Sequence, residues 1–146
     1  MNIYNLEQYI LFLMIKYNEL DLRHLKLKIE RAEPTLNDKL LNYQLSLLKE
    51  EGYIEFIFIE EQSEEYKKCL EKTTDRRIKN IARYCKQKYP SRILLKITDS
   101  GKIKYIHNCY CLSYCGTKNE KTALHNMILC EELADIKTKP PSKCLC

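Results

Sequence analysis

Apolar residues recur every three or four positions along much of this chain, the spacing that places side chains on one face of an α-helix. The pattern predicts a first helix over residues 6–17, with Asn5 as its N-cap, and a second helix over residues 22–29, with Asp21 as its N-cap. Because a proline disfavours helical conformation in the residue before it, Pro34 ends the second helix.

A third helix is predicted to start at Leu36, where Thr35 and Asp38 form a shortened capping box. Two runs rich in β-branched and aromatic residues follow, and they predict strands over residues 53–59 and 92–98. Three helices with a tight turn between the second and third indicate a helix-turn-helix core. The fold class predicted from these elements is therefore α+β, mostly helical.

The last third of the chain is predicted to be helical. Asp99 and Ser100 can cap a fourth helix that ends at Gly116, and a fifth, strongly apolar helix follows over residues 120–136. Residues 138–146 contain two prolines and two lysines, and we expect them to form a flexible tail.

Two stretches of the chain resemble parts of a known family. Residues 45–54 read LSLLKEEGYI, in which the end of a helix, a glycine that can adopt left-handed conformation and the start of a strand follow one another. Residues 92–106 read RILLKITDSGKIKYI, which is similar to a strand, a turn and the next helix. In this order the two stretches resemble the winged-helix (winged helix-turn-helix) DNA-binding domain superfamily, of the prokaryotic transcription-regulator type.

This resemblance implies a winged-helix domain over residues 1–107, in which the two strands form a two-stranded wing. Residues 60–90 stand where the family has a short hairpin, so we expect a basic helical insertion in the wing. Residues 108–137 would then form a C-terminal helical extension, and added C-terminal helices in such regulators commonly make a dimer.

The formal net charge of +5 is concentrated in one short segment. Residues 75–89 contain six basic residues and one acidic residue, so the charges of the remaining chain cancel. An element that faces phosphates needs such a concentration, because each neutralised phosphate releases counterions. The alternative is a solvated helix face that happens to be basic. The basic residues are Arg76, Arg77, Lys79, Arg83, Lys86 and Lys88.

In the resembled family the third helix enters the major groove. On this helix a polar strip of Lys39, Asn42, Ser46 and Lys49 is the candidate for base contacts, since asparagine suits adenine and lysine suits guanine or phosphate. The same helix has an apolar stripe nearly opposite its core face, and an acidic segment follows at residues 60–65. These two features favour the alternative function, a winged-helix protein-interaction module that does not bind DNA. The stripe consists of Leu36, Leu40, Tyr43 and Leu47.

The chain has eight cysteines, and in a reducing compartment we expect free thiols rather than a disulfide framework. His107, Cys111 and Cys115 lie at four-residue spacing on the fourth helix, and Cys130 on the fifth helix could reach them, so these four form a candidate zinc site. Cysteine is also a common apolar core residue. We expect core cysteines and no cofactor, with a thiol- or zinc-sensing regulator as the alternative.

The apolar runs are too short to span a membrane, and the chain contains no phosphate-binding loop, dinucleotide fingerprint or nucleophile elbow. We therefore expect a cytoplasmic protein that is not an enzyme and has no membrane partner. The expected partners are double-stranded DNA and a second copy of the chain, and the expected role is transcription regulation.

Overall fold

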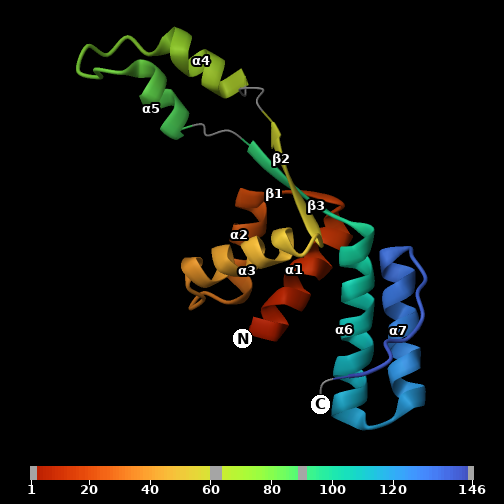
Figure 1. Ribbon diagram of the computed structural model, residues 1–146. Coiled ribbons are helices and arrows are strands. Elements are labelled where there is room, and N and C mark those ends of the chain that lie inside the picture. The colour runs from red at the N-terminus through yellow and green to blue at the C-terminus, as the bar shows by residue number, and fades with distance from the viewer. Residues whose placement is uncertain (1–2, 60–63, 89–91, 145–146) are drawn as a thin grey trace.

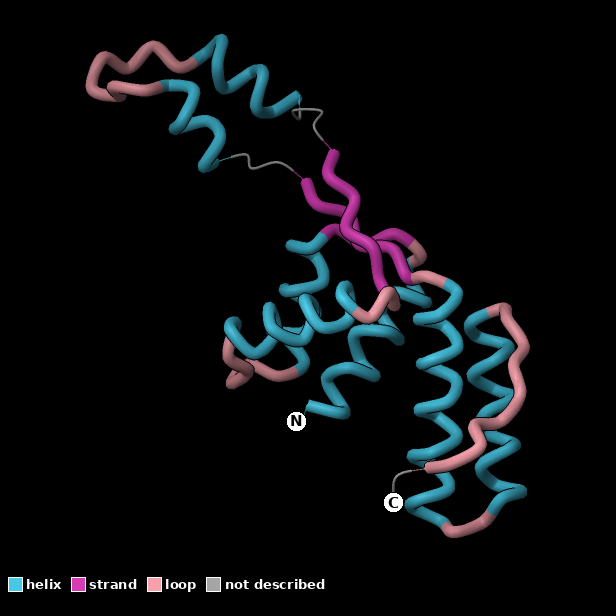
Figure 2. Tube along the Cα trace, viewed as in Figure 1, coloured by secondary structure: helices cyan, strands magenta, loops and turns pink. Residues whose placement is uncertain are grey.

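The computed structural model describes residues 3–59, 64–88 and 92–144 (Figures 1 and 2). In this part of the chain the structure is mostly helical with one small sheet, which confirms the predicted α+β class. The elements in chain order are α1 (Ile3–Tyr17), β1 (Glu19–Asp21), α2 (Leu22–Ala32), α3 (Asp38–Glu50), β2 (Ile54–Ile59), α4 (Glu64–Lys72), α5 (Ile81–Lys88), β3 (Arg92–Ile97), α6 (Asp99–Thr117) and α7 (Glu120–Ala134).

The sheet has three antiparallel strands in the order β1-β3-β2, where the sequence predicted two. Along the β2–β3 pair, Ile54 lies opposite Ile97 at one end and Ile59 lies opposite Arg92 at the other. β1 pairs with the other edge of β3 over only three residues. A strand this short shows no alternating pattern in the sequence, so the periodicity analysis missed it.

The core lies between helices α1, α2 and α3 and one face of the sheet. α3 buries Leu41, Leu45 and Leu48, the face that the sequence predicted to pack inward. α1 supplies the largest share of fully buried apolar side chains, in line with its three- and four-residue spacing. From α1 these are Leu6, Ile10, Leu11 and Met14; from α2 and the sheet they are Leu25, Ile29, Ile54 and Leu95.

Two predicted helix starts are wrong. α1 already contains Asn5, which therefore is not its N-cap. α3 starts at Asp38, and its N-cap is Asn37, whose side-chain oxygen accepts a backbone N–H hydrogen bond of 2.8 Å. The predicted cap, Thr35, instead donates its hydroxyl hydrogen to the carboxylate of Glu33 at 3.0 Å. Because the Thr35 hydroxyl is hydrogen-bonded to Glu33, it does not cap α3.

Other helix ends follow the sequence more closely. Asp21 caps α2 as predicted and accepts the backbone N–H of Arg23 at 2.8 Å. Thr98 caps α6, in place of the two residues after it that the sequence suggested. Gly116 lies inside α6, which ends with Lys118 in left-handed conformation at a φ of 54°.

The start of β2 and the start of α6 are joined by a close backbone contact. Thr98 donates its backbone N–H to the Tyr53 carbonyl at 3.0 Å and its hydroxyl hydrogen to the Gly52 carbonyl at 2.7 Å. Gly101, in the first turn of α6, is buried directly against Tyr53; a Cβ there would overlap the Tyr53 carbonyl oxygen and approach Ile97 Cγ1 to 2.7 Å. Gly52 has the left-handed conformation predicted for it, with a φ of 80°. The two stretches that carry the family resemblance therefore meet here.

α6 packs beside α1, and α7 returns antiparallel along α6 (Figure 1). α6 is continuous through His107, where the sequence placed a boundary between the first domain and an extension. The segment that follows α7, predicted as a flexible tail, is attached to α6 by a disulfide between Cys111 and Cys144, and His107 Nε2 lies 2.9 Å from the Lys139 carbonyl oxygen. None of the described helices is long and apolar enough to cross a membrane.

The contact at Gly101 makes a prediction about stability. Gly101→Ala should lower the free energy of unfolding by about 2 kcal/mol or more, because the added methyl group meets backbone that cannot move without losing the Thr98 hydrogen bonds. Gly116→Ala is the matched control: the same substitution in the same helix has open space. It should raise the free energy by about 0.5–1 kcal/mol, since alanine is the better helix former. Urea unfolding measures both, and equal effects of the two substitutions would contradict the role of this contact.

Candidate nucleic-acid interface

The insertion between β2 and β3 is a hairpin of two helices, α4 and α5, where the sequence predicted one. It projects beyond the ends of β2 and β3, toward the side of the sheet that carries α2 and α3, and α6 and α7 lie on the other side (Figure 1). A disulfide between Cys69 on α4 and Cys85 on α5 joins the two helices, with the Cα atoms 5.8 Å apart. The prediction of free thiols is wrong for this pair, because it rested on the expected compartment and not on which helix faces meet.

The hairpin has a very small core of its own. Tyr66 and Cys85 are its buried side chains, and Ile78 and Ile81 are half-buried. Thr73 ends α4 by donating its hydroxyl hydrogen to the Cys69 carbonyl at 2.6 Å. So few buried residues cannot hold two short helices together without a cross-link. The Cys69–Cys85 disulfide is therefore the main constraint on the shape of the hairpin.

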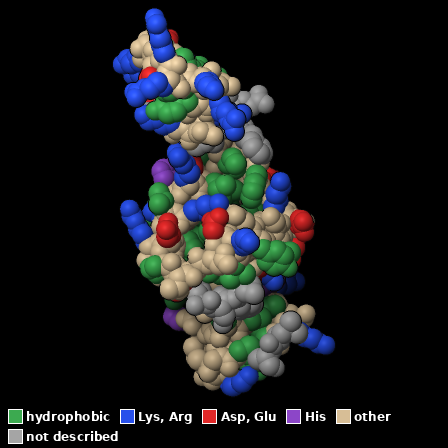
Figure 3. Space-filling view, turned by 90° about the vertical axis from the view of Figure 1, so that its left-hand side faces the viewer, with side chains coloured by type: hydrophobic (Ala, Val, Ile, Leu, Met, Phe, Trp, Pro, Cys, Tyr) green, Lys and Arg blue, Asp and Glu red, His purple; other side chains and the backbone are tan. Residues whose placement is uncertain are grey.

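The predicted basic residues lie together on this hairpin, all of them exposed. Figure 3 shows Lys and Arg side chains gathered over this end of the molecule. Arg77 is engaged locally: its Nη2 lies 3.2 Å from Asp75 Oδ2, and its hydrogen bonds hold the pKa of Asp75 below the ordinary value. Four cations of the loop and α5 have no ion pair with a carboxylate among the described residues: Arg76, Lys79, Arg83 and Lys86.

The predicted polar strip of α3 is exposed along its whole length, at Lys39, Asn42, Ser46 and Lys49. Two of these side chains already have partners within the chain. Asn42 Nδ2 donates to Asp38 Oδ2 at 3.2 Å, and Lys49 Nζ lies 4.9 Å from the centre of the Phe56 ring on β2. The strip therefore carries a lysine donor at each end, Lys39 and Lys49. The Lys49 ammonium is positioned by its contact with the Phe56 ring of β2.

The apolar stripe on α3 is largely covered by the chain itself. Leu36 and Leu40 are half-buried against the core, and Leu47 is also half-buried. Tyr43 is the exception, with 59% of its surface exposed. A partner protein is therefore not needed to cover most of this stripe, which weakens the case for an interaction module.

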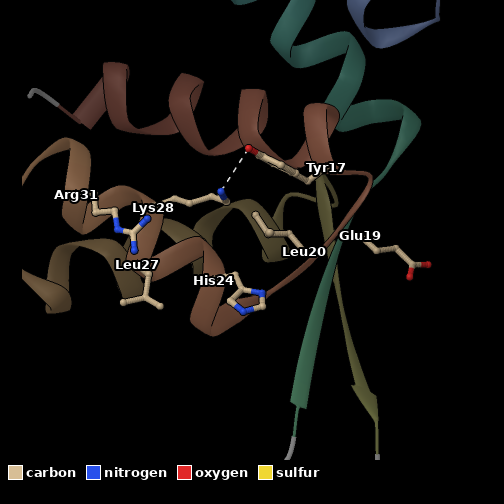
Figure 4. Close-up of a pocket in the computed structure, with 7 residues that line it drawn as sticks. All are labelled: Tyr17, Glu19, Leu20, His24, Leu27, Lys28 and Arg31. Atoms are coloured by element: carbon tan, nitrogen blue, oxygen red, sulfur yellow. Dashed lines mark hydrogen bonds between the residues drawn. The ribbon is translucent and has the colours of Figure 1, made fainter.

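A second candidate site is a cleft of about 460 Å³ between the end of α1, β1 and α2. In Figure 4 the Lys28 ammonium points toward the Tyr17 hydroxyl, with Nζ and the oxygen 3.3 Å apart, and the Glu19 carboxylate points away from the cleft. The hydrogen bond from Lys28 and the nearby charge of Lys16 lower the pKa of Tyr17. The residues lining the cleft are Tyr17, Glu19, Leu20, His24, Leu27, Lys28 and Arg31.

Chemically, this cleft is suited to an anion. Lys28 and Arg31 have no carboxylate partner among the described residues, and Leu20 supplies a buried apolar floor. The sequence analysis missed it, because the lining residues come from three elements and form no recognisable spacing.

The candidate zinc ligands are not brought together as a metal site. Cys111 is bonded to Cys144, Cys115 is also disulfide-bonded, and His107 contacts the C-terminal segment. No group of three His, Cys, Asp or Glu side chains that could hold a metal ion occurs in the described residues. The sequence spacing did not show that the segment after α7 returns along α6 and brings Cys144 to Cys111. The free thiols in the part of the chain that the structure describes are Cys109 and Cys130.

The small core of the hairpin predicts a strong dependence on its disulfide. In a Cys69→Ser, Cys85→Ser double variant, amide protection in α4 and α5 should fall by about 100-fold, since closing a loop of this length is worth about 3 kcal/mol. Protection in α1 and β3 should not change. Hydrogen exchange followed by mass spectrometry measures both. The control is Cys111→Ser with Cys144→Ser, which removes a disulfide elsewhere and should leave the hairpin protected; hairpin amides equally protected in both variants would contradict the prediction.

Comparison with protein-family models, with curated proteins and with solved structures finds no match for this chain.

Proposed function

We propose that this chain is a winged-helix protein that binds double-stranded DNA and regulates transcription. The order of elements supports the proposal: helix, short strand, two helices and two further strands, with the sheet order β1-β3-β2. The contact of Thr98 and Gly101 with Tyr53 also supports it, because the two resembling stretches pack on each other as one unit.

The observation that carries the proposal is the basic hairpin at the end of the β2–β3 pair, in which Arg76, Lys79, Arg83 and Lys86 have no carboxylate partner among the described residues. Its described residues, 64–88, include nine basic and four acidic side chains. Phosphate contacts supply most of the affinity of non-specific DNA binding, and flexible exposed lysines and arginines make them. A hairpin that projects toward the α2 and α3 side can contact the DNA backbone beside a helix in the major groove.

Base recognition is assigned to the polar strip of α3. Asn42 would contact adenine, and Lys39 guanine or phosphate, with Ser46 and Lys49 beside them. For Asn42 to read a base, its amide must leave Asp38, to which it donates in the free protein. Asp38 remains paired with Lys26 at 3.6 Å, which limits its repulsion of DNA. This function requires neither catalysis nor a cofactor.

We further propose that the protein acts as a homodimer through α7. This helix exposes three large apolar side chains, Ile128, Leu129 and Leu133, with 52%, 51% and 45% of their surfaces accessible. Grouped apolar side chains on one helix commonly mark an interface. A second copy would place two α3 helices on one DNA duplex, as the family's two-fold symmetric regulators do.

The proposed phosphate contacts can be tested by removing the unpaired cations. A variant with Arg76, Lys79, Arg83 and Lys86 changed to Ala should bind a labelled random-sequence duplex at least about 100-fold more weakly at low salt. The magnitude of the slope of log affinity against log salt should fall by about 3.6 if all four cations contact phosphate, since each lost contact removes about 0.9. Fluorescence anisotropy across a salt series measures both quantities.

The matched control removes four positive charges elsewhere. Lys121, Lys137, Lys139 and Lys143 are exposed on α7 and the segment after it. Changing them to Ala lowers the net charge equally and should leave the slope nearly unchanged. If both variants lose the same affinity and slope, only net charge matters and the hairpin is not the interface. If the wild type does not bind duplex at low salt, the proposed function is wrong.

The proposed dimer makes a separate prediction. Leu129→Lys should convert the protein to a monomer at micromolar concentration, because a desolvated charge in an apolar interface costs several kcal/mol. Sedimentation velocity measures the molar mass. Leu112→Lys, an exposed leucine on α6, is the control and should not change it. A wild-type protein that sediments as a monomer would exclude the dimer.

A further inference from the structure

Cys109 on α6 and Cys130 on α7 lie opposite each other. The two helices run antiparallel, and their register is given by Asn126 Nδ2, which donates to Ser113 Oγ at 2.8 Å. Cys109 is one turn before Ser113 along α6, and Cys130 is one turn after Asn126 along α7. In antiparallel helices this places the two thiols at the same level. Each thiol shifts the pKa of the other, and both are only partly buried.

A network from α1 holds one of these sulfur atoms in place. Gln8 Nε2 donates to Cys109 Sγ at 3.1 Å and to the Tyr105 carbonyl at 3.0 Å. Asn108 Nδ2 donates to Gln8 Oε1 at 3.0 Å, which fixes the orientation of the Gln8 amide. Burial raises the pKa of the Tyr105 hydroxyl, and the two nearby thiols add to this shift. The sulfur pair is therefore positioned by three helices.

The surroundings make the two thiols unequal. The hydrogen bond from Cys109 lowers the pKa of Cys130, and the same bond, with burial, raises the pKa of Cys109. Cys109 is thus the donor and Cys130 the group that ionises first. Because the thiolate is the nucleophile in thiol–disulfide exchange, Cys130 should react first. A dithiol in which one sulfur attacks and the other completes the exchange needs this asymmetry.

We propose that Cys109 and Cys130 form a redox-active dithiol that closes to a disulfide between α6 and α7 on exchange with a small-molecule disulfide. Cys130 thiolate attacks one sulfur of that molecule, forms a mixed disulfide and releases one thiolate. Cys109 then loses its proton to water, attacks Cys130 Sγ and releases the second thiolate. Two electrons pass from the protein sulfurs to the small molecule, whose two thiolates take up the two protons that the cysteines lost.

This site is distinct from the disulfides already present. Cys69–Cys85 and Cys111–Cys144 are closed in the structure and Cys115 is also disulfide-bonded, while Cys109 and Cys130 remain thiols. Closing a Cys109–Cys130 bridge would add a link between α6 and α7 near the Gln8 network and would replace the hydrogen bond that Gln8 makes to the Cys109 thiol. Oxidation at this position would therefore also change a side-chain contact of α1, the central helix of the core.

The test uses the full chain, purified without reductant and equilibrated with glutathione at a series of ratios of oxidised to reduced form. Peptide mass spectrometry should show a Cys109–Cys130 linkage that increases with the oxidised fraction and is lost again on adding reduced glutathione. The disulfides already present, at Cys69–Cys85, Cys111–Cys144 and Cys115, should remain closed over this range. Failure of the linkage to form even in oxidised glutathione alone would overturn the proposal.

Two serine variants test the order of the steps. In Cys109→Ser, glutathione should be trapped on Cys130 as a mixed disulfide, since no second thiol displaces it. In Cys130→Ser, Cys109 should be modified at least tenfold more slowly. Equal rates in the two variants would overturn the assignment of Cys130 as the attacking thiol. The wild-type linkage remains an independent readout if either variant folds poorly.

Discussion

The contact between Gly101 and the Tyr53 carbonyl is the constraint on which the arrangement of the whole molecule depends. It ties the first turn of α6 to the first residue before β2, while β3, which leads into α6, pairs with β2 along its full length. The β2–β3 pair is therefore held at one end by α6 and extends freely at the other, where the basic hairpin is attached. The β2–β3 pair thus separates two ends of the molecule, with α6 and α7 at one end and the basic hairpin at the other (Figure 2).

The two ends are stabilised in different ways. Around α1, apolar burial is extensive, and side-chain hydrogen bonds such as Gln8 to Cys109 connect the helices. In the described part of the hairpin, only a few side chains are buried. The Cys69–Cys85 disulfide is therefore the main link that holds α4 and α5 together. This division leaves the surface of the hairpin available for charge, because little of it is needed for packing. Arg76, Lys79, Arg83 and Lys86 therefore remain available for the proposed phosphate contacts.

Much of this fold can be predicted from the sequence where a long periodic pattern exists. The core face of α3, the β2 and β3 strands and the last two helices follow from apolar spacing, and Gly52 follows from the need for left-handed conformation. Three features could not be predicted. β1 is too short to show a period, the disulfides depend on which helix faces meet in space, and the cleft near Tyr17 draws its residues from three separate elements. The pairing of Cys109 with Cys130 likewise needs the register of α6 and α7, which the sequence does not state.

The central claim is that α3 and the α4–α5 hairpin contact duplex DNA together. Photocrosslinking to duplex DNA that contains 5-iodouracil tests this most directly, because exposed tyrosines near the bases react and the attached peptides can be identified by mass spectrometry. Tyr43 on α3 and Tyr84 on α5 are both exposed and serve as reporters. We predict crosslinked peptides from both elements and none from α6, whose Tyr114 is partly exposed. Crosslinks confined to α6, or no crosslinks under conditions where DNA is bound, would contradict the proposal.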